Sequence, residues 1–288
     1  MMISMRTTVA LVIAVAVFGG ACAQVPGKPH ASPSHGATTA TAAPRPKGFV
    51  ALGDSYTSGG GATPYDVDLA CVVSSQSWPN QLVKLEPRLH LIQNRACGGA
   101  QTKQLLQPWP QRGRQAQISR TPDDSVGLVA FTIGGNDLHM AQTIASCFTA
   151  DCAGAASSRK AWSYLDALQE QLVMDVYPAL RRAYPRARLI HVGYPLLTSE
   201  DAGKSCPWLA PEERAEPTAI VNAINGAIRT AASESSRIEY VDVAHAFAGH
   251  ELCTRDSWVY DLADERALHP TAAGYAALAA VIDRALRR

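Results

Sequence analysis

The sequence has almost no excess of either charge, and this excludes several kinds of partner at the outset. Its 288 residues include 26 lysines and arginines and 25 aspartates and glutamates, which give a net charge of +1 at pH 7. Such a balance provides no basic field for nucleic acid and no acidic field for cations. We therefore expect no nucleic-acid partner.

The sequence also lacks the usual signatures of metal and nucleotide sites. The cysteines are dispersed, and His, Asp and Glu residues form no cluster with the spacing of metal ligands. Neither a Gly-Lys-Thr phosphate loop nor the glycine pattern of a dinucleotide site is present. We expect neither a metal nor another cofactor.

The apolar run near the N-terminus, Val9–Phe18, is too short to span a membrane. A basic residue precedes it and small residues follow through Ala23, which is the pattern of a secretory signal peptide over residues 1–23. The sequence Gly19-Gly20-Ala21-Cys22 offers an alternative, a degenerate lipobox in which Cys22 would be lipidated. Either signal predicts an exported protein, secreted or held at the cell envelope.

Residues 24–47 consist mainly of Pro, Ser, Thr, Ala and Gly, with almost no large apolar side chain. Such a segment cannot bury enough apolar surface to offset the entropy lost on ordering, so it is expected to be a disordered linker. It would hold a domain formed by residues 48–288 away from a membrane or cell wall with which the N-terminus associates.

Strand-like runs alternate with helical patterns throughout residues 48–288. Five short runs rich in apolar residues predict strands, at Phe49–Leu52, Leu89–Gln93, Val126–Ile133, Arg188–Val192 and Ile238–Val243. Strands separated by helices are typical of a parallel sheet covered on both faces. We predict an α/β fold with a five-stranded parallel sheet in one domain.

Proline positions help to place the predicted helices. The first helix should cover Trp78–Leu85, and a second should run through Leu165 and Leu180 with a kink or early end at Pro178. The helix containing Ile220 should begin at Pro217, and the last helix should begin at Pro270.

The stretch from Gly48 to Gly61, GFVALGDSYTSGGG, contains the best candidate for a reactive residue. A buried strand that ends at Gly53-Asp54-Ser55 would place the serine hydroxyl at the carboxyl edge of the sheet, where open α/β sheets bind ligands. A serine needs a base to take its proton, and His269 is the best-suited histidine. Two further stretches contain glycine and asparagine: NRACGGAQT, from Asn94, and TIGGND, from Thr132.

These three stretches and the segment Leu268-His269-Pro270 form four blocks. Together they resemble the SGNH, or GDSL, family of serine esterases and lipases, and in particular its secreted actinobacterial branch with three disulfides. The likeness extends from about Phe49 to the C-terminus and implies a three-layer α/β/α, flavodoxin-like fold. It implies that Ser55 is the nucleophile and His269 the base. The backbone N–H groups of Ser55 and Gly99 and the side-chain amide of Asn136 would form the oxyanion hole.

The sequence departs from the common family pattern three residues before the histidine. Most members carry an aspartate there that orients the imidazole, whereas this chain has Arg266. An arginine side chain accepts no hydrogen bond, but the main-chain carbonyl of Arg266 can accept one from His269. We favour such a Ser-His dyad, with Asp264 and Asp261 as the alternative carboxylates of a triad.

Removing Cys22 from the seven cysteines leaves an even set of six. An even number in an exported protein indicates disulfides, although six cysteines allow fifteen pairings. The resemblance implies consecutive pairing of these residues: Cys71 with Cys97, Cys147 with Cys152, and Cys206 with Cys253.

The leading functional hypothesis is an exported hydrolase of carboxylic esters, acting on acyl esters of lipids or small molecules. An O-deacetylase or acyltransferase acting on envelope polysaccharide is an alternative that uses the same site. A binding module without catalysis is a third, which the retention of all four blocks argues against. We expect a monomer.

Overall fold

The computed structural model describes residues 47–147, 156–199 and 215–288. The predicted signal peptide and the predicted linker up to residue 46 lie outside these residues. The described residues belong to one compact unit. Across them, no helix combines the length and apolar character that crossing a bilayer requires.

Five strands form one sheet in which every neighbouring pair is parallel. Their order, β2-β1-β3-β4-β5, is that of flavodoxin-like folds and confirms the predicted fold class. The last strand ends at Val241, two residues earlier than predicted, because the Asp242 carboxylate accepts the N–H of Ala244 and turns the chain. The strands are β1 (Lys47–Gly53), β2 (Leu89–Asn94), β3 (Val126–Thr132), β4 (Arg188–Val192) and β5 (Ile238–Val241).

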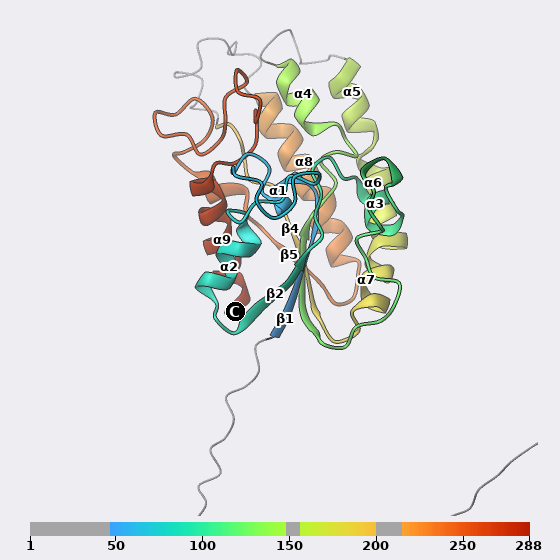
Figure 1. Ribbon diagram of the computed structural model, residues 1–288. Helices are drawn as coiled ribbons and strands as arrows, with labels where there is room; N and C mark the ends of the chain where they lie inside the picture. The colour runs from blue at the N-terminus through green and yellow to red at the C-terminus, as the bar shows by residue number, and fades with distance from the viewer. Residues whose placement is uncertain (1–46, 148–155, 200–214) are drawn as a thin grey trace, which may run out of the picture. The chain divides into compact units, whose positions relative to one another are not determined.

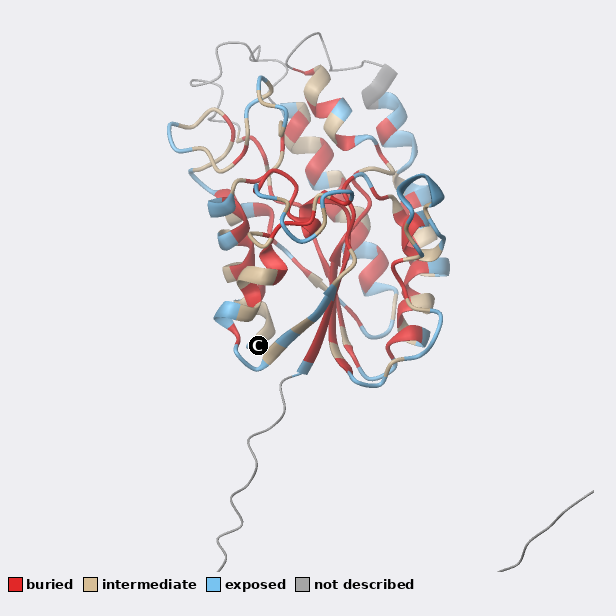
Figure 2. Cartoon of the chain, viewed as in Figure 1, coloured by how far each residue is buried: buried red, intermediate tan, exposed pale blue. Residues whose placement is uncertain are grey.

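Burial follows the position of each strand in the sheet (Figure 2). The neighbouring strands β1 and β3 are buried on both faces, apart from Lys47 and the half-buried Gly127. The edge strand β2 has no buried residue and alternates between half-buried and exposed positions over its first four residues. Continuous apolar runs therefore mark the strands that carry helices on both faces.

Helices cover both faces of the sheet, as the resemblance implied (Figure 1). Helices α2 (Trp78–Leu85) and α9 (Ala272–Leu286) contact each other on one face. The other face carries α3 (Thr102–Leu106), α6 (Leu165–Gln171), α7 (Tyr177–Ala183) and α8 (Ala215–Ser233). The remaining helices are α1 (Ser55–Ser58), α4 (Met140–Ser146), α5 (Ala156–Ser163), the 3-10 helices η1 (Pro110–Arg112) and η5 (Ala244–Phe247), and the π-helix η2 (Leu172–Val176).

Three prolines lie close to the predicted helix boundaries but not on them. The π-turn η2 interrupts the helical run before Pro178, which is the second residue of α7 and needs no N–H partner there. Pro217 lies inside α8, whose described part begins at Ala215, so the helix starts before the predicted position. The last helix begins at Ala272 rather than Pro270, because Thr271 is its N-cap and accepts the N–H of Gly274.

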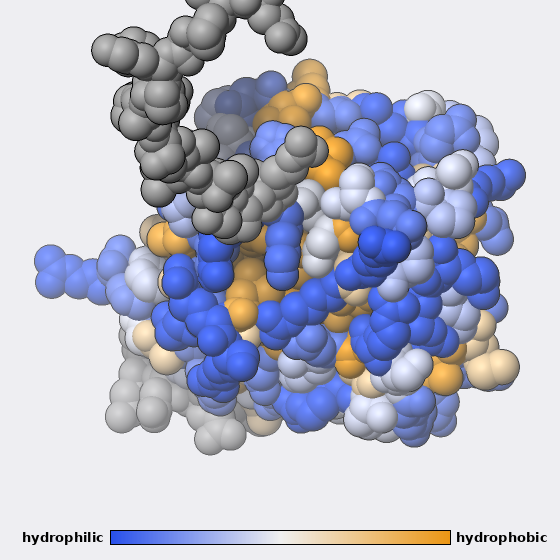
Figure 3. Space-filling model, turned by 90° about the horizontal axis from the view of Figure 1, so that it is seen from below, coloured by the Kyte–Doolittle hydropathy of each residue, from blue (hydrophilic) through white to orange (hydrophobic). Residues whose placement is uncertain are grey.

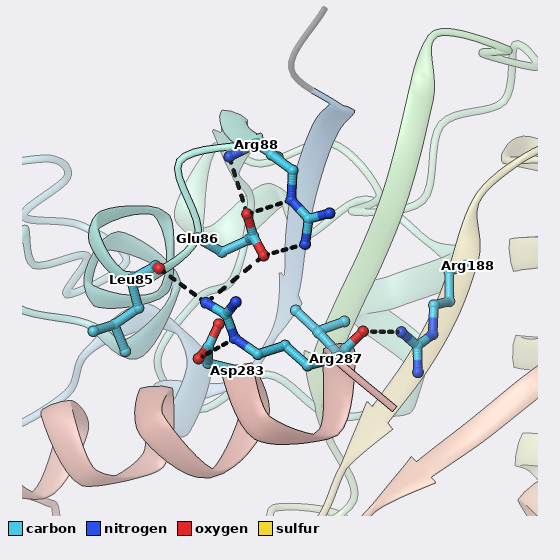
Figure 4. A network of polar contacts seen from close by, with 7 residues as sticks. Leu85, Glu86, Arg88, Arg188, Asp283 and Arg287 are labelled. Carbon is cyan, nitrogen blue, oxygen red and sulfur yellow. Dashed lines mark hydrogen bonds and ion pairs between the residues drawn. The ribbon is translucent and has the colours of Figure 1, made fainter. Parts of the chain in front are cut away.

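The amino ends of the strands form the lower end of Figure 1, where polar contacts join α2, α9 and β4 (Figure 4). Arg88 pairs with Glu86 at 2.6 Å, and Arg287 pairs with Asp283 at 2.9 Å. Arg188 donates to the carbonyl of Leu286 at the end of α9. Seen from below, hydrophilic side chains predominate on this end, with apolar ones between them (Figure 3).

Candidate active site

The turn after β1 places Ser55 at the carboxyl edge of the sheet. Gly53 has a φ of +124°, and a Cβ at this position would collide with the carbonyl oxygen of Thr132. A glycine is therefore required. The Asp54 carboxylate caps α1 by accepting the N–H of Tyr56 at 2.9 Å, so that Ser55 is the first residue of that helix.

His269 lies beside Ser55, with 2.8 Å between His269 Nε2 and Ser55 Oγ. The other ring nitrogen, Nδ1, lies 3.0 Å from the carbonyl oxygen of Ala267 and 3.3 Å from that of Arg266. A carbonyl only accepts, so Nδ1 carries the proton and Nε2 is free to accept the serine proton. Burial lowers the pKa of His269 below its usual 6.5, although both carbonyl contacts oppose the shift.

Main-chain oxygens thus orient the imidazole in this structure, and the nearer one belongs to Ala267, which sequence reasoning missed. The carboxylate of Asp264 instead binds the Arg266 side chain at 2.6 Å, and this contact holds the pKa of Asp264 at about 2. Asp261 accepts the N–H of Ala263. Among the hydrogen bonds of the described residues, neither carboxylate reaches His269.

Gly99 and Asn136 lie on the loops after β2 and β3 and line the same cavity as Ser55. Gly99 has a φ of +82°, the left-handed region that favours glycine. Asn136 donates one hydrogen of Nδ2 to the carbonyl of Ala100 at 2.9 Å, which leaves the second hydrogen for another acceptor. No hydrogen bond between described residues uses the backbone N–H of Ser55 or Gly99.

Further contacts tie the two glycine-containing loops together. Gln101 donates to the carbonyl of Asn136 at 3.0 Å. The N–H of Thr102 lies 3.1 Å from both oxygens of Asp137, which thereby binds the start of α3. The two loops are therefore fixed relative to each other by both side chains and backbone.

A cavity of about 350 Å³ brings the four candidate residues together. Ser55, Gly99, Asn136 and His269 all line it, together with both apolar and charged side chains. These are Val72, Met140, Leu197, Arg112, Glu265 and Arg266.

Tyr194, which follows β4, links the serine turn to the asparagine loop. Its hydroxyl donates to Asp54 Oδ2 at 2.5 Å and accepts the N–H of Gly135 at 2.8 Å. The side chain of Asn225 in α8 in turn pairs with both the N–H and the carbonyl of Tyr194. Burial raises the pKa of Asp54 to about 7, even though the hydrogen bonds from Tyr194 and Tyr56 favour the ionised form.

Two more buried tyrosines hold the serine and histidine segments in place. Tyr56 donates to the carbonyl of Leu268, next to the histidine, at 2.6 Å. Tyr275 in α9 lies within hydrogen-bonding distance of the carbonyls of both Ser55 and Gly60, at 3.0 and 2.7 Å. Sequence reasoning placed Tyr275 on the inward face of the last helix but missed the hydrogen bonds of all three tyrosines; for Tyr194, its place just after a predicted strand was an available signal.

The structure contains the predicted disulfide between Cys71 and Cys97. Cys147 and Cys253 are also disulfide-bonded. Their expected partners, Cys152 and Cys206, lie outside the described residues, so these two pairings stay predictions. Within the described ranges, no group of three or more His, Cys, Asp or Glu side chains could hold a metal ion.

Comparison with known proteins identifies the family of the chain. The family model of the GDSL-like lipase/acylhydrolase family matches residues 51–277, which is most of the chain. The chain belongs to this family. The predicted SGNH/GDSL resemblance is thereby confirmed.

Individual relatives of this GDSL-like chain are lipases. A lipase of Streptomyces rimosus is 34% identical over 246 residues, covering 83% of this chain and 87% of the relative. Lipase 1 of Streptomyces coelicolor is 30% identical over 254 residues, with the same two coverages. Together with the family match, these relatives identify the chain as an ester-hydrolysing enzyme.

Solved structures of two Streptomyces enzymes are also similar to this chain. The structure of an extracellular lipase from Streptomyces rimosus is similar with a TM-score of 0.71 at 31% identity, covering 83% of this chain and 99% of that one. Phospholipase A1 from Streptomyces albidoflavus has a TM-score of 0.69 at 29% identity, with coverages of 83% and 98%.

Proposed function

We propose that the chain is an exported hydrolase of acyl esters that works through a serine acyl-enzyme and a Ser-His dyad. The 2.8 Å contact between Ser55 Oγ and His269 Nε2, with main-chain carbonyls behind the ring, is the observation that carries this proposal. The extracellular lipase among the similar structures supports export. Residues 1–23 would supply the signal peptide.

In the first half of the reaction, His269 Nε2 takes the proton of Ser55 as its Oγ attacks the ester carbonyl. The carbonyl oxygen becomes an oxyanion. Three donors converge on the cavity to stabilise it: the N–H groups of Ser55 and Gly99 and the second Nδ2 hydrogen of Asn136. The imidazolium then gives its proton to the departing alkoxide, which leaves an acyl group on Ser55.

In the second half, water enters after the alcohol has left. His269 takes a proton from the water, whose oxygen attacks the acyl carbonyl, and returns a proton to Ser55 Oγ as the acid is released. The carbonyl of Ala267, together with that of Arg266, keeps the Nδ1 proton in place through both halves. Apart from Ser55 and His269, which exchange this proton, no residue needs to change its protonation state.

Covalent labelling with a fluorophosphonate tests the nucleophile directly. We expect labelling of the wild type and of Ser55→Thr to be much stronger than labelling of Ser55→Ala, which should show none. Peptide mapping should place the adduct on Ser55. An adduct on another serine, or equal labelling of Ser55→Ala, would contradict the proposed nucleophile.

The class of substrate is tested by a chain-length series of p-nitrophenyl esters run beside acetylated glycans. We expect hydrolysis of the acyl esters and little release of acetate from the glycans. The opposite preference would favour the O-deacetylase alternative on the same site.

A further inference from the structure

Residues 66–72, here called the tip, adjoin the candidate active-site cavity and display two apolar side chains to solvent. Leu69 is 77% exposed, more than any other large apolar side chain of the described residues, and Val67 is 55% exposed. Val72 within the tip and Tyr65 just before it line the cavity. The exposed side chains therefore lie within a few residues of the cavity wall.

The exposure of the tip does not come from a loose backbone. Asp68 and Val73 exchange backbone hydrogen bonds, with Val73 N donating at 2.8 Å. Arg112 donates to the carbonyl of Ala70 at 2.6 Å, and the Cys71–Cys97 disulfide fixes the far side of the tip. Leu69 is thus presented outward by a segment whose polar groups are bonded on several sides.

Backbone conformation adds to this argument. Val72 has a φ of +49°, which is rarely found for a β-branched residue and costs conformational energy. The N–H of Gly98 donates to the carbonyl of Cys71 at 3.0 Å and holds this segment against the Gly99 loop. A strained residue tied to the Gly99 loop, beside apolar side chains left in water, points to a partner that covers those side chains.

The charges around the tip balance. Asp68 pairs with Arg114 at 2.6 Å, and Asp66 accepts from both the N–H and the hydroxyl of Ser75. Together with Arg112, which donates to the carbonyl of Ala70, these residues amount to two carboxylates and two guanidinium groups. A partner that fits this surface is apolar and needs no net charge.

We propose that the tip docks the enzyme on the surface of aggregated neutral or zwitterionic lipid, with Leu69 and Val67 entering the apolar layer. This inference rests on the proposed function, since an acyl ester of low solubility must reach the cavity from such an aggregate. Burying the two side chains would bring the cavity mouth against the surface and strengthen binding in proportion to the apolar area covered.

The test compares two double variants in full-length chains that all carry Cys22→Ala, so that no lipid at Cys22 anchors them. One is Val67→Ser with Leu69→Ser. The matched control is Leu85→Ser with Met174→Ser, which removes two side chains that are 44% and 66% exposed and line no part of the cavity. Co-sedimentation with phosphatidylcholine vesicles is measured beside hydrolysis of a long-chain p-nitrophenyl ester in those vesicles and of soluble p-nitrophenyl acetate.

We expect the tip variant to lose about tenfold or more in vesicle binding and in hydrolysis of the vesicle-borne ester. Its kcat/KM for p-nitrophenyl acetate should stay within about twofold of the wild type, because neither residue touches the reacting atoms. The control variant should match the wild type in all three measurements. Adding phosphatidylglycerol to the vesicles should change binding little, because the tip has no charge excess.

Three results would overturn the proposal: a wild type that does not bind the vesicles, an equal loss in the control variant, or an equal loss on the soluble and vesicle-borne esters. The last would make the tip a wall of the cavity rather than a docking element. Vesicle binding without any ester hydrolysis would contradict the proposed function and leave the docking inference standing.

Discussion

The two ends of the sheet are held together by different kinds of polar contact. At the carboxyl end, buried tyrosine hydroxyls bind backbone groups and one carboxylate, as Tyr56 does with Leu268 at 2.6 Å. At the amino end, solvent-exposed arginines bind carboxylates and helix ends: the side chains of Arg88 and Arg287 are 75% and 51% exposed, whereas their partners Glu86 and Asp283 are 7% and 14% exposed.

The difference matches what each end has to do. A buried hydrogen bond leaves an unsatisfied group when it is broken, so it fixes one geometry strongly. An ion pair whose arginine lies in solvent is partly screened and contributes about 1 kcal/mol to stability. Buried hydrogen bonds surround the candidate active site, where small displacements of the catalytic groups lower the rate. Arginine–carboxylate pairs lie at the other end of the sheet.

The largest expected effect is at the dyad itself. Ser55→Ala and His269→Ala should each reduce ester hydrolysis to the background rate, and the double variant should be scarcely worse, because nucleophile and base act as one unit. Steady-state kinetics on a soluble p-nitrophenyl ester measures this. Losses that add would show that the two residues do not work together.

Next in size is the loss of one oxyanion donor. Asn136→Ala should lower kcat by roughly 100- to 1000-fold, while KM should change little, because the hydrogen bond strengthens only as charge develops on the oxygen. The comparison of kcat with KM is the decisive measurement. A variant that raises KM alone would assign Asn136 to substrate binding.

The buried tyrosines allow a direct test of the hydrogen bonds at the carboxyl end of the sheet. Tyr194→Phe removes the hydroxyl that joins Asp54 to Gly135, and we expect kcat to fall about tenfold as the catalytic groups shift. Tyr177→Phe is the matched control, since its buried hydroxyl contacts His191 Nδ1 at 2.9 Å and lines no part of the cavity. Both variants should lose about 1–3 kcal/mol of unfolding free energy. Equal kcat in the two variants would limit Tyr194 to a structural role.

A smaller effect is expected for the carboxylates near the histidine. Asp264→Asn and Asp261→Asn should retain most activity, whereas loss of a triad carboxylate costs about 10⁴ in kcat. The rate should fall on acidification as His269 takes up a proton, and burial places this transition below pH 6.5. That limb of the pH profile should be the same in both variants. A thousandfold loss in either folded variant would show a displaced triad.

The smallest effect is expected at the amino end of the sheet. Arg287→Ala removes the contacts to Asp283, to Glu86 and to the carbonyl of Leu85, and should cost about 1 kcal/mol of unfolding free energy. Ester hydrolysis should not change. Urea unfolding and the same kinetic assay measure the two quantities, and a clear loss of activity would mean that the two ends are coupled.

The amino-acid sequence by itself determined the sheet and the order of its reactive segments. Apolar runs placed all five strands to within two residues, because buried parallel strands are apolar on both faces. The turn at Gly53 could be predicted from the end of an apolar strand, whereas the roles of Gly99 and Asn136 were predicted only from the family resemblance. Proline gave helix starts only approximately, since the N-cap Thr271 and the π-turn of η2 depend on neighbouring contacts.

Only the tertiary structure decided which residues hold the turn of Ser55 and the ring of His269 in position. Ala267 lies closest to His269 Nδ1 through a backbone oxygen, and every residue type has that oxygen, so no sequence pattern marks it. Tyr194 lies 140 residues from Asp54 along the chain and meets it only because β4 and β1 end at the same edge of the sheet. No sequence pattern marks Leu69 as exposed, and the hydrogen bonds and disulfide of the folded chain hold the tip that presents it to solvent.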